Sequence, residues 1–339
     1  MKKPILAGGG ALLFLGVAVA LLMVVPVATQ EPGPRFSAWG QATPLGRPFT
    51  DVGQQQGCPF IAKDDLNLYF RALIPRGGTS NRDWDIFVSH RESVDDPWGT
   101  PVNLGSKINS PTPVGKNANG PVYSNELCTF VTIDGHWLYF VSNRLGGYGM
   151  GDLWLAHRKD KDDPTGWETP VNLGPNVNTT NGETGPSIFE DEASGKTMLY
   201  FSRTYPVSGS SPPRNGNKIW QVELLDWDNP GTPALVPELN TTGENNMHTF
   251  VRRKDGLEVI FVSDRTGGLG WWELWTSTRP STSSPWSKPV HLGALVNSEY
   301  DETRPSLSWD GTTLYFWTDR ESWMIHLYKS ERTKITGKK

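Results

Sequence analysis

The chain has 339 residues, which is enough to bury a hydrophobic core without disulfide or metal staples. Its 32 basic and 36 acidic residues give a net charge of −4, which argues against nucleic-acid binding, because such proteins need a basic face. The high contents of glycine (36), proline (27) and tryptophan (15) favour many short strands joined by turns over helices.

The N-terminus has the pattern of an export segment. Lys2 and Lys3 precede an uncharged run, residues 5–25, which would span about 31 Å as a helix and so could cross a bilayer. The pattern predicts either a signal peptide within residues 1–29 or an uncleaved membrane anchor, and both alternatives stay open. In either case we expect a periplasmic, cell-surface or secreted protein, with residues 30–36 as a linker.

A unit of 55 to 70 residues recurs five times along the rest of the chain. Each copy contains a strand that ends in a pair of aromatic or aliphatic residues: Tyr69-Phe70, Tyr139-Phe140, Tyr200-Phe201, Ile260-Phe261 and Tyr315-Phe316. In four copies a polar residue and then an arginine follow the pair, and we interpret these arginines as struts between repeats: Arg144, Arg203, Arg265 and Arg320. The next short strand ends in a basic residue, Arg91, Arg158, Arg279 or Arg332.

The last part of the unit is a tryptophan followed seven residues later by a glycine: Trp98/Gly105, Trp167/Gly174 and Trp286/Gly293. Hairpin turns such as Asp134-Gly135 and Gly146-Gly147 separate the strands, and no helical period appears after residue 30. Five units of four strands predict an all-β fold, a five-bladed β-propeller of four-stranded antiparallel blades over residues 37–335, with a tail at residues 336–339.

A lone copy of the fourth strand comes before the first unit, where Trp39 is followed by Gly46 at the same spacing. The chain ends after the third strand of the fifth unit. We therefore expect the N-terminal strand to complete the last blade and close the ring. Closure would remove two strand edges that otherwise invite aggregation.

The repeat resembles that of TolB-like propeller proteins. The resemblance rests on residues 304–316, which read RPSLSWDGTTLYF, and residues 261–268, which read FVSDRTGG, and it extends over residues 57–332. It implies a propeller fold. It also implies an exported protein of a group that includes periplasmic interaction proteins, surface-anchored binding proteins and propeller-shaped lyases. No catalytic motif of a subgroup matches this sequence, so the resemblance supplies no catalytic residues.

Two rings of residues are predicted where the first strand of each unit enters the central channel. The first ring is Gln56, Glu126, Glu183, Asn246 and Glu302. The second, two residues on, is Cys58, Cys128, Gly185, His248 and Arg304. Three converging carboxylates could act as acid and base, bind a hard cation, or hydrogen-bond a sugar or cationic peptide. They could also accept hydrogen bonds from the backbone and tie blades together.

Other ring residues also have more than one interpretation. Cys58 and Cys128 could form a disulfide, remain free buried thiols, or bind a metal with His248. Arg304 could clamp a substrate carboxylate or neutralise Glu302. We predict no metal and no cofactor.

Features outside the repeat are more informative about function. Trp271 and Trp272 could present an aromatic platform to a sugar, or could be rim packing. Residues 110–124 and 206–217 are insertions rich in turn-forming residues, so we expect loops that can carry a binding site.

The functional prediction from these features is an exported, monomeric, non-enzymatic module that binds a glycan, peptide or envelope protein at the funnel and mouth loops. The alternative is a carbohydrate-active enzyme, either a glycoside hydrolase or a polysaccharide lyase. Its candidate catalytic residues would be Glu126, Glu183, Glu302 and His248.

Overall fold

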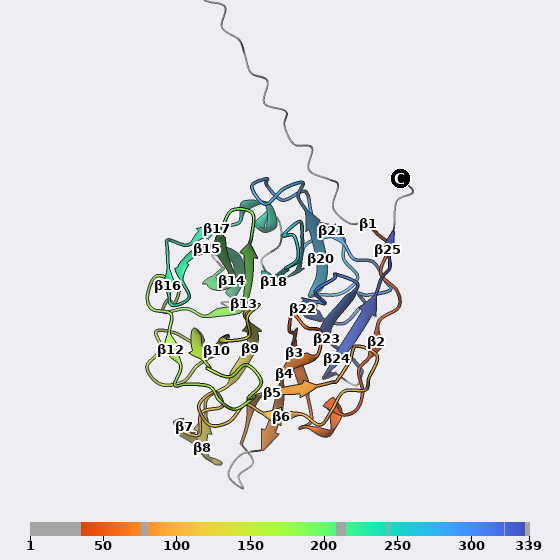
Figure 1. Ribbon diagram of the computed structural model, residues 1–339. Coiled ribbons are helices and arrows are strands. Elements are labelled where there is room, and N and C mark those ends of the chain that lie inside the picture. Colours follow the sequence, from red (N-terminus) through yellow and green to blue (C-terminus); the bar gives the residue numbers. More distant parts are fainter. Residues whose placement is uncertain are drawn as a thin grey trace, which may run out of the picture. The chain divides into compact units, whose positions relative to one another are not determined.

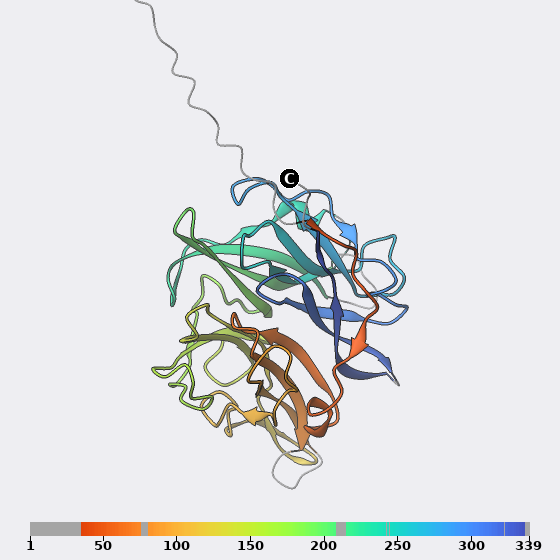
Figure 2. The same cartoon turned by 45° about the vertical axis from the view of Figure 1, so that its right-hand side comes forward.

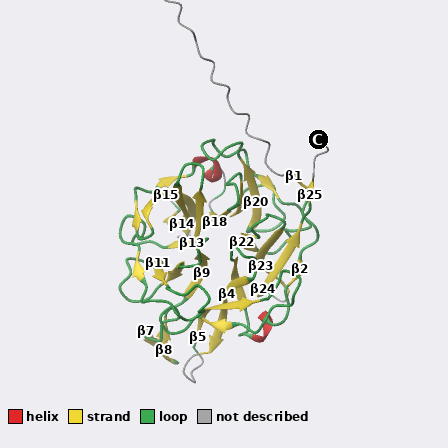
Figure 3. Cartoon of the chain, in the orientation of Figure 1, coloured by secondary structure: helices red, strands yellow, loops and turns green. Residues whose placement is uncertain are grey.

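The computed structural model describes residues 35–75, 81–207, 215–241, 243, 245–321 and 323–335. Five antiparallel sheets stand around a common centre (Figure 1). Within the described residues the only helices are two short 3-10 turns, η1 (Phe49–Asp51) and η2 (Pro237–Asn240), which Figure 3 shows in red. The predicted five-bladed β-propeller is confirmed.

The strands follow the order expected from the repeat. Blade one is β3 (Gln56–Ile61), β4 (Asn67–Pro75), β5 (Arg82–His90) and β6 (Val102–Asn103). Blade two is β9 (Glu126–Val131), β10 (Trp137–Ser142), β11 (Asp152–His157) and β12 (Val171–Asn172). Blade three is β13 (Glu183–Asp191), β14 (Lys196–Pro206), β15 (Asn215–Asp226) and β16 (Asn229–Pro230), and β17 (Ala234–Leu235) also pairs with β15.

The last two blades complete the ring. Blade four is β18 (Asn246–Val251), β19 (Glu258–Ser263), β20 (Glu273–Thr278) and β21 (Val290–His291). Blade five is β22 (Glu302–Leu307), β23 (Thr313–Glu321), β24 (Met324–Glu331) and, from the N-terminal part of the chain, β2 (Thr43–Pro44). The inner strands of adjacent blades, β3, β9, β13, β18 and β22, contact one another around the centre.

The predicted closure by the N-terminal strand is also confirmed. Thr43 of β2 pairs with Lys329 of β24, and β1 (Arg35–Phe36) pairs with β25 (Lys334–Ile335). Figure 2 shows this N-terminal segment, in red and orange, beside the blue strands of the last blade. The edge of blade five is therefore paired within the chain.

The repeated arginines and tryptophans at the outer edges of the blades pack on each other. Each guanidinium lies over the tryptophan ring, with these distances to the ring centroid: Arg91 on Trp98 4.4 Å, Arg158 on Trp167 4.3 Å, Arg279 on Trp286 4.2 Å and Arg332 on Trp39 4.2 Å. The Nε of each arginine also donates to a carbonyl of the turn between the first two strands. These contacts explain why the residues recur, and they place Trp39 in blade five.

Four predicted segments differ from expectation or lie wholly or mostly outside the described residues. The insertion at residues 110–124 is a small hairpin rather than a plain loop, formed by β7 (Pro113–Asn117) and β8 (Gly120–Tyr123). The export segment, most of the linker and the tail at residues 336–339 lie outside the described residues. Among the helices that are described, none is long and apolar enough to cross a membrane.

Candidate functional site

The glutamates of the first ring point between the strands of their own blade and are fully shielded from solvent. Each carboxylate forms an ion pair with the arginine that follows the aromatic pair. The three pairs are Glu126 with Arg144 (Oε1–Nη2 3.3 Å), Glu183 with Arg203 (Oε1–Nε 3.0 Å) and Glu302 with Arg320 (Oε1–Nη2 2.8 Å). No side-chain surface of these glutamates is exposed, so they do not face a ligand in the channel.

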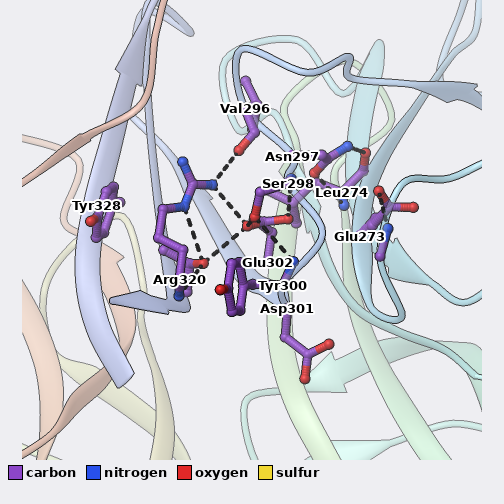
Figure 4. A network of polar contacts seen from close by, with 12 residues as sticks. Glu273, Leu274, Val296, Asn297, Ser298, Tyr300, Asp301, Glu302, Arg320 and Tyr328 are labelled. Carbon is purple, nitrogen blue, oxygen red and sulfur yellow. Dashed lines mark hydrogen bonds and ion pairs between the residues drawn. The ribbon is translucent and has the colours of Figure 1, made fainter. Parts of the chain in front are cut away.

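Glu302 shows how these groups stabilise a blade (Figure 4). One oxygen accepts hydrogen bonds from Ser298 Oγ (2.6 Å), Thr318 Oγ1 (3.0 Å) and Arg320 Nη2 (2.8 Å). The other accepts from the backbone N–H of Ser298 at 2.9 Å. Arg320 Nη2 also donates to the carbonyl of Val296, in the loop before β22. The network therefore ties two strands of blade five to the loop that leads into it.

In blades four and one, an amide side chain takes the place of the first-ring glutamate. In blade four, Asn246 Oδ1 accepts from Arg265 Nη2 and from Ser263 Oγ, both at 2.9 Å. In blade one no polar-arginine step follows the aromatic pair, and Gln56 itself donates to the carbonyls of Val52 and Gly53. All five first-ring positions therefore have structural partners.

Burial shifts the first-ring carboxyls toward the protonated form. It raises the pKa of Glu126 to about 7, because burial outweighs the hydrogen bonds from Ser124 and Ser142 and the charge of Arg144. Burial also raises the pKa values of Glu183 and Glu302. These shifts come from shielding within the blades rather than from carboxylates that repel one another across a channel.

The second ring does face the channel. Each inner strand bulges at this position, and its residue has a left-handed backbone: φ is 52° at Cys58, 51° at Cys128, 64° at Gly185, 50° at His248 and 60° at Arg304. Such a conformation is uncommon outside glycine. The bulge turns each of these side chains out of the strand and toward the centre.

Beneath this ring, three phenylalanines fill the channel. The ring centroids are 4.6 Å apart for Phe60 and Phe130, and 6.2 Å apart for Phe130 and Phe250. The cavity left among the second-ring residues has a volume of about 30 Å³. A water or a small functional group fits into this space, whereas a sugar ring does not.

The two cysteines meet inside this ring. Their sulfurs are 2.8 Å apart, both residues are buried, and both are free thiols in the structure. The disulfide therefore stays a prediction. Within the described residues no group of three or more histidine, cysteine, aspartate or glutamate side chains is arranged to hold a metal ion.

Two aspartates, Asp301 just before β22 and Asp319 on β23, lie opposite each other in blade five. The backbone N–H of Asp301 donates to Asp319 Oδ1 at 3.0 Å, so the Asp319 carboxylate lies beside Asp301. Both residues are half-buried, and Figure 4 shows the Asp301 carboxylate pointing away from the Glu302 network. Burial, with the negative charges of Asp319 and Glu302, raises the pKa of Asp301 to about 6.

Aromatic side chains surround this pair. The backbone N–H of Trp272 donates to Asp301 Oδ1 at 3.2 Å, and its indole N–H has no partner. The Tyr300 ring packs edge-on against Trp323 at 5.1 Å. Trp323 and Trp271 are 75% and 68% exposed. The carboxylate pair thus borders an apolar surface that is open to solvent.

The sequence contained a signal for this pair that we did not use. Blade two has two asparagines at the equivalent positions, Asn125 and Asn143, joined by the same kind of hydrogen bond. Blade four has Asn245 and Asp264. Only blade five has a carboxylate at both positions. Asp319 belongs to the repeated polar-arginine step, and from the sequence we interpret only the arginines of that step.

The similarity of this chain to known proteins is found in its structure. No family model and no curated protein matches the sequence. Solved glycoside hydrolases are similar over most of their length, at 13 to 15% identity. An α-L-arabinofuranosidase from Lactobacillus brevis matches with a TM-score of 0.56 and 15% identity, covering 86% of this chain and 93% of that chain. An α-L-arabinofuranosidase from Coprinopsis cinerea matches with a TM-score of 0.56 and 13% identity, covering 88% of this chain and 98% of that chain. An endo-arabinase from Bacteroides thetaiotaomicron matches with a TM-score of 0.51 and 15% identity, covering 90% of this chain and 98% of that chain. At such identities the similarity establishes the fold.

Two predictions are corrected by these neighbours. The assignment to TolB-like proteins is wrong, because the neighbours are family 43 and family 62 glycoside hydrolases. The residues that carried the resemblance are turn and strand residues, which other propellers also need. The prediction of a non-enzymatic binding module is also wrong, since the neighbours favour the carbohydrate-active alternative. Of the two enzyme classes in that alternative, they agree with glycoside hydrolase.

Proposed function

We propose that this protein is a glycoside hydrolase that cleaves a glycan at the rim of blade five, with Asp301 and Asp319 as its acid and base. The observation that carries the proposal is the carboxylate pair itself. The Asp319 carboxylate accepts the backbone N–H of Asp301 at 3.0 Å, both residues are half-buried, and the pKa of Asp301 is raised to about 6. Glycoside hydrolysis typically uses two such carboxyl groups in different protonation states.

The roles follow from the environment of each group. Asp301 stays protonated up to a pH of about 6 and can donate its proton to the glycosidic oxygen of the leaving sugar. Asp319 supplies the negative charge that helps to raise the pKa of Asp301. As a carboxylate it can activate water or attack the sugar directly. The fully shielded glutamates of the first ring cannot take either role, because a substrate cannot reach them.

The surroundings of the pair suit a carbohydrate. Trp323 and Trp271 present exposed rings on which a sugar face can stack. The names of the structural neighbours, arabinofuranosidase and endo-arabinase, make arabinose-containing glycans the first substrates to test.

The test is release of reducing sugar by the purified full chain from arabinan, arabinoxylan and xylan. We expect hydrolysis of at least one of these glycans. Asp301→Asn should lower kcat by about 10² to 10⁴ without unfolding the protein, because a general acid contributes that much to the rate. The control is Asp264→Asn, which changes a blade-four aspartate at the position equivalent to Asp319. No hydrolysis by the wild type, or equal losses in the two variants, would refute the proposal.

A further inference from the structure

Two arginines near the centre of the channel lack an acidic partner. Arg304 donates from Nη2 to Thr184 Oγ1 at 3.1 Å, while its buried Nη1 has no partner. The Arg71 guanidinium lies over the ring of Trp84, 4.1 Å from its centroid, and its buried Nε has no partner either. Within the described residues neither arginine forms an ion pair, unlike Arg144, Arg203 and Arg320 in the ties described above.

A buried histidine shares this position. His248 is only 6% exposed, its Nδ1 lies 3.2 Å from Thr303 Oγ1, and its Nε2 has no partner. Burial, with the positive charges of Arg304 and Arg71, lowers the pKa of His248, so the imidazole is neutral. An unpaired polar atom this deeply buried is unfavourable unless a ligand or water completes it.

The space between these groups is kept open by Gly185. A Cβ at this position would lie 2.9 Å from His248 Cδ2 and 3.4 Å from Arg304 Nη1. With φ at +64°, the backbone there also disfavours any other residue. Arg304, His248 and Gly185 line the cavity, and Arg71 lies behind it with its Nε against Gly57. Together these four residues form what we call the cationic centre, above the three phenylalanines.

The charges of the cationic centre do not balance. Burial raises the pKa of Cys58, but the hydrogen bond with Cys128 and the charges of Arg71 and Arg304 outweigh burial and lower it below its usual range. Even with Cys58 as a thiolate, two guanidinium groups face one negative charge, so one positive charge has no counter-charge there. An anionic group that enters from the rim would supply it.

We propose that the cationic centre binds a carboxylate group of the substrate, and that the glycans cleaved at blade five contain uronic acid. A guanidinium fork matches the two oxygens of a carboxylate, and the cavity of about 30 Å³ admits such a group but not a whole sugar. Arg304 lies on β22, three residues after Asp301, which directly precedes that strand, so the cationic centre is close along the chain to the proposed acid. This inference rests on the proposed function for the identity of the ligand.

The test compares binding of two oligosaccharides by calorimetry, using the full chain. The probes are a glucuronic-acid-substituted xylo-oligosaccharide and the same compound after reduction of its carboxyl group to an alcohol. Binding is measured on the wild type at 4 °C and on Asp301→Asn, so that turnover does not obscure it. We expect the acidic compound to bind at least tenfold more tightly, and its advantage to shrink as salt rises.

Variants assign the preference to the cationic centre. Arg304→Gln and Arg71→Gln should each remove most of the preference for the acidic oligosaccharide. Arg304→Lys keeps the positive charge but loses the guanidinium fork, so it should keep part of that preference. The charge control is Arg47→Gln, since that side chain is 84% exposed and pairs only with Asp51. Thermal unfolding checks that each variant is folded.

Three results would overturn the inference. The first is equal affinity for the two oligosaccharides, and the second is a preference for the acidic oligosaccharide that survives Arg304→Gln in a folded protein. The third is displacement of the acidic oligosaccharide by sodium sulfate as efficiently as by free glucuronate, which would indicate a site for inorganic anions only. The outcome is separable from that of the proposed function. A preference for the acidic compound without hydrolysis of any glycan would refute the hydrolase and leave the carboxylate site standing.

Discussion

Glu302→Gln tests whether the first-ring glutamates stabilise the fold or act on a substrate. The carboxylate accepts four hydrogen bonds, from two atoms of Ser298, from Thr318 and from Arg320. A glutamine replaces one accepting oxygen by an NH₂ group. That group must then face either the backbone N–H of Ser298 or the three donors Ser298 Oγ, Thr318 Oγ1 and Arg320 Nη2. It also leaves the Arg320 guanidinium, whose side chain is only 16% exposed, without its counter-charge.

The expected cost can be worked from these contacts. Breaking a buried ion pair by removing one partner costs about 3 to 5 kcal/mol, and the partial exposure of Arg320 places the value near the lower end. Blade four shows that an amide at the first-ring position does not by itself destabilise a blade. There, Asn246 directs its NH₂ at the carbonyl of Gly243, whereas the equivalent group in blade five would meet the N–H of Ser298. We therefore expect Glu302→Gln to lower the free energy of unfolding by about 3 kcal/mol.

The assay is urea unfolding followed by tryptophan fluorescence, with Arg320→Gln and the double variant completing a thermodynamic cycle. The two single changes should be strongly non-additive, because each removes the same contact. Folded Glu302→Gln protein should keep the kcat of the wild type. A loss of stability below about 0.5 kcal/mol, or a large loss of kcat with full stability, would contradict the structural role of this glutamate.

Three further predictions concern the cysteines, the pH profile and the aromatic rim. Oxidation by a low-molecular-weight disulfide should join Cys58 to Cys128, with a mass loss of 2 Da. The new bond should stabilise the fold by about 4 kcal/mol, because the two cysteines are 70 residues apart in sequence. Two thiols that can still be alkylated after oxidation would contradict this. Hydrolysis should fall as pH rises through about 6, because Asp301 acts in its protonated form; a rate that rises across this range would refute that role. Trp323→Ala should raise KM several-fold with little effect on stability, since the side chain is 75% exposed; an unchanged KM would show that the ring does not contact the substrate.

The fold was predictable because its determinants are repeated. Aromatic pairs that close strands, and arginines that stack on tryptophans, recur at nearly constant spacing, and Trp39 obeys the same spacing outside the first unit. Each of the five blades therefore carries an aromatic or aliphatic pair at the end of a strand. The order of strands and the closure of blade five follow from this repetition.

The site was harder to predict because strand position does not determine which way a side chain points. We aligned the first ring correctly as equivalent positions, but the structure turns Glu126, Glu183 and Glu302 between strands and pairs each with an arginine. The bulge two residues later, which turns Cys58 and His248 toward the channel, leaves no mark in the residue pattern. The pair at Asp301 and Asp319 could have been found as a departure from the repeat.

The most direct test of the proposed mechanism is the dependence of Asp301→Asn on the leaving group. An aryl glycoside with an acidic phenol leaves without a proton, whereas a natural sugar leaving group needs one. The comparison is between rates on a natural oligosaccharide and on the 2,4-dinitrophenyl glycoside of the same sugar. We predict that the variant loses at least 10²-fold on the oligosaccharide and keeps most of its rate on the aryl glycoside. Equal losses on both substrates would mean that Asp301 does not donate the proton.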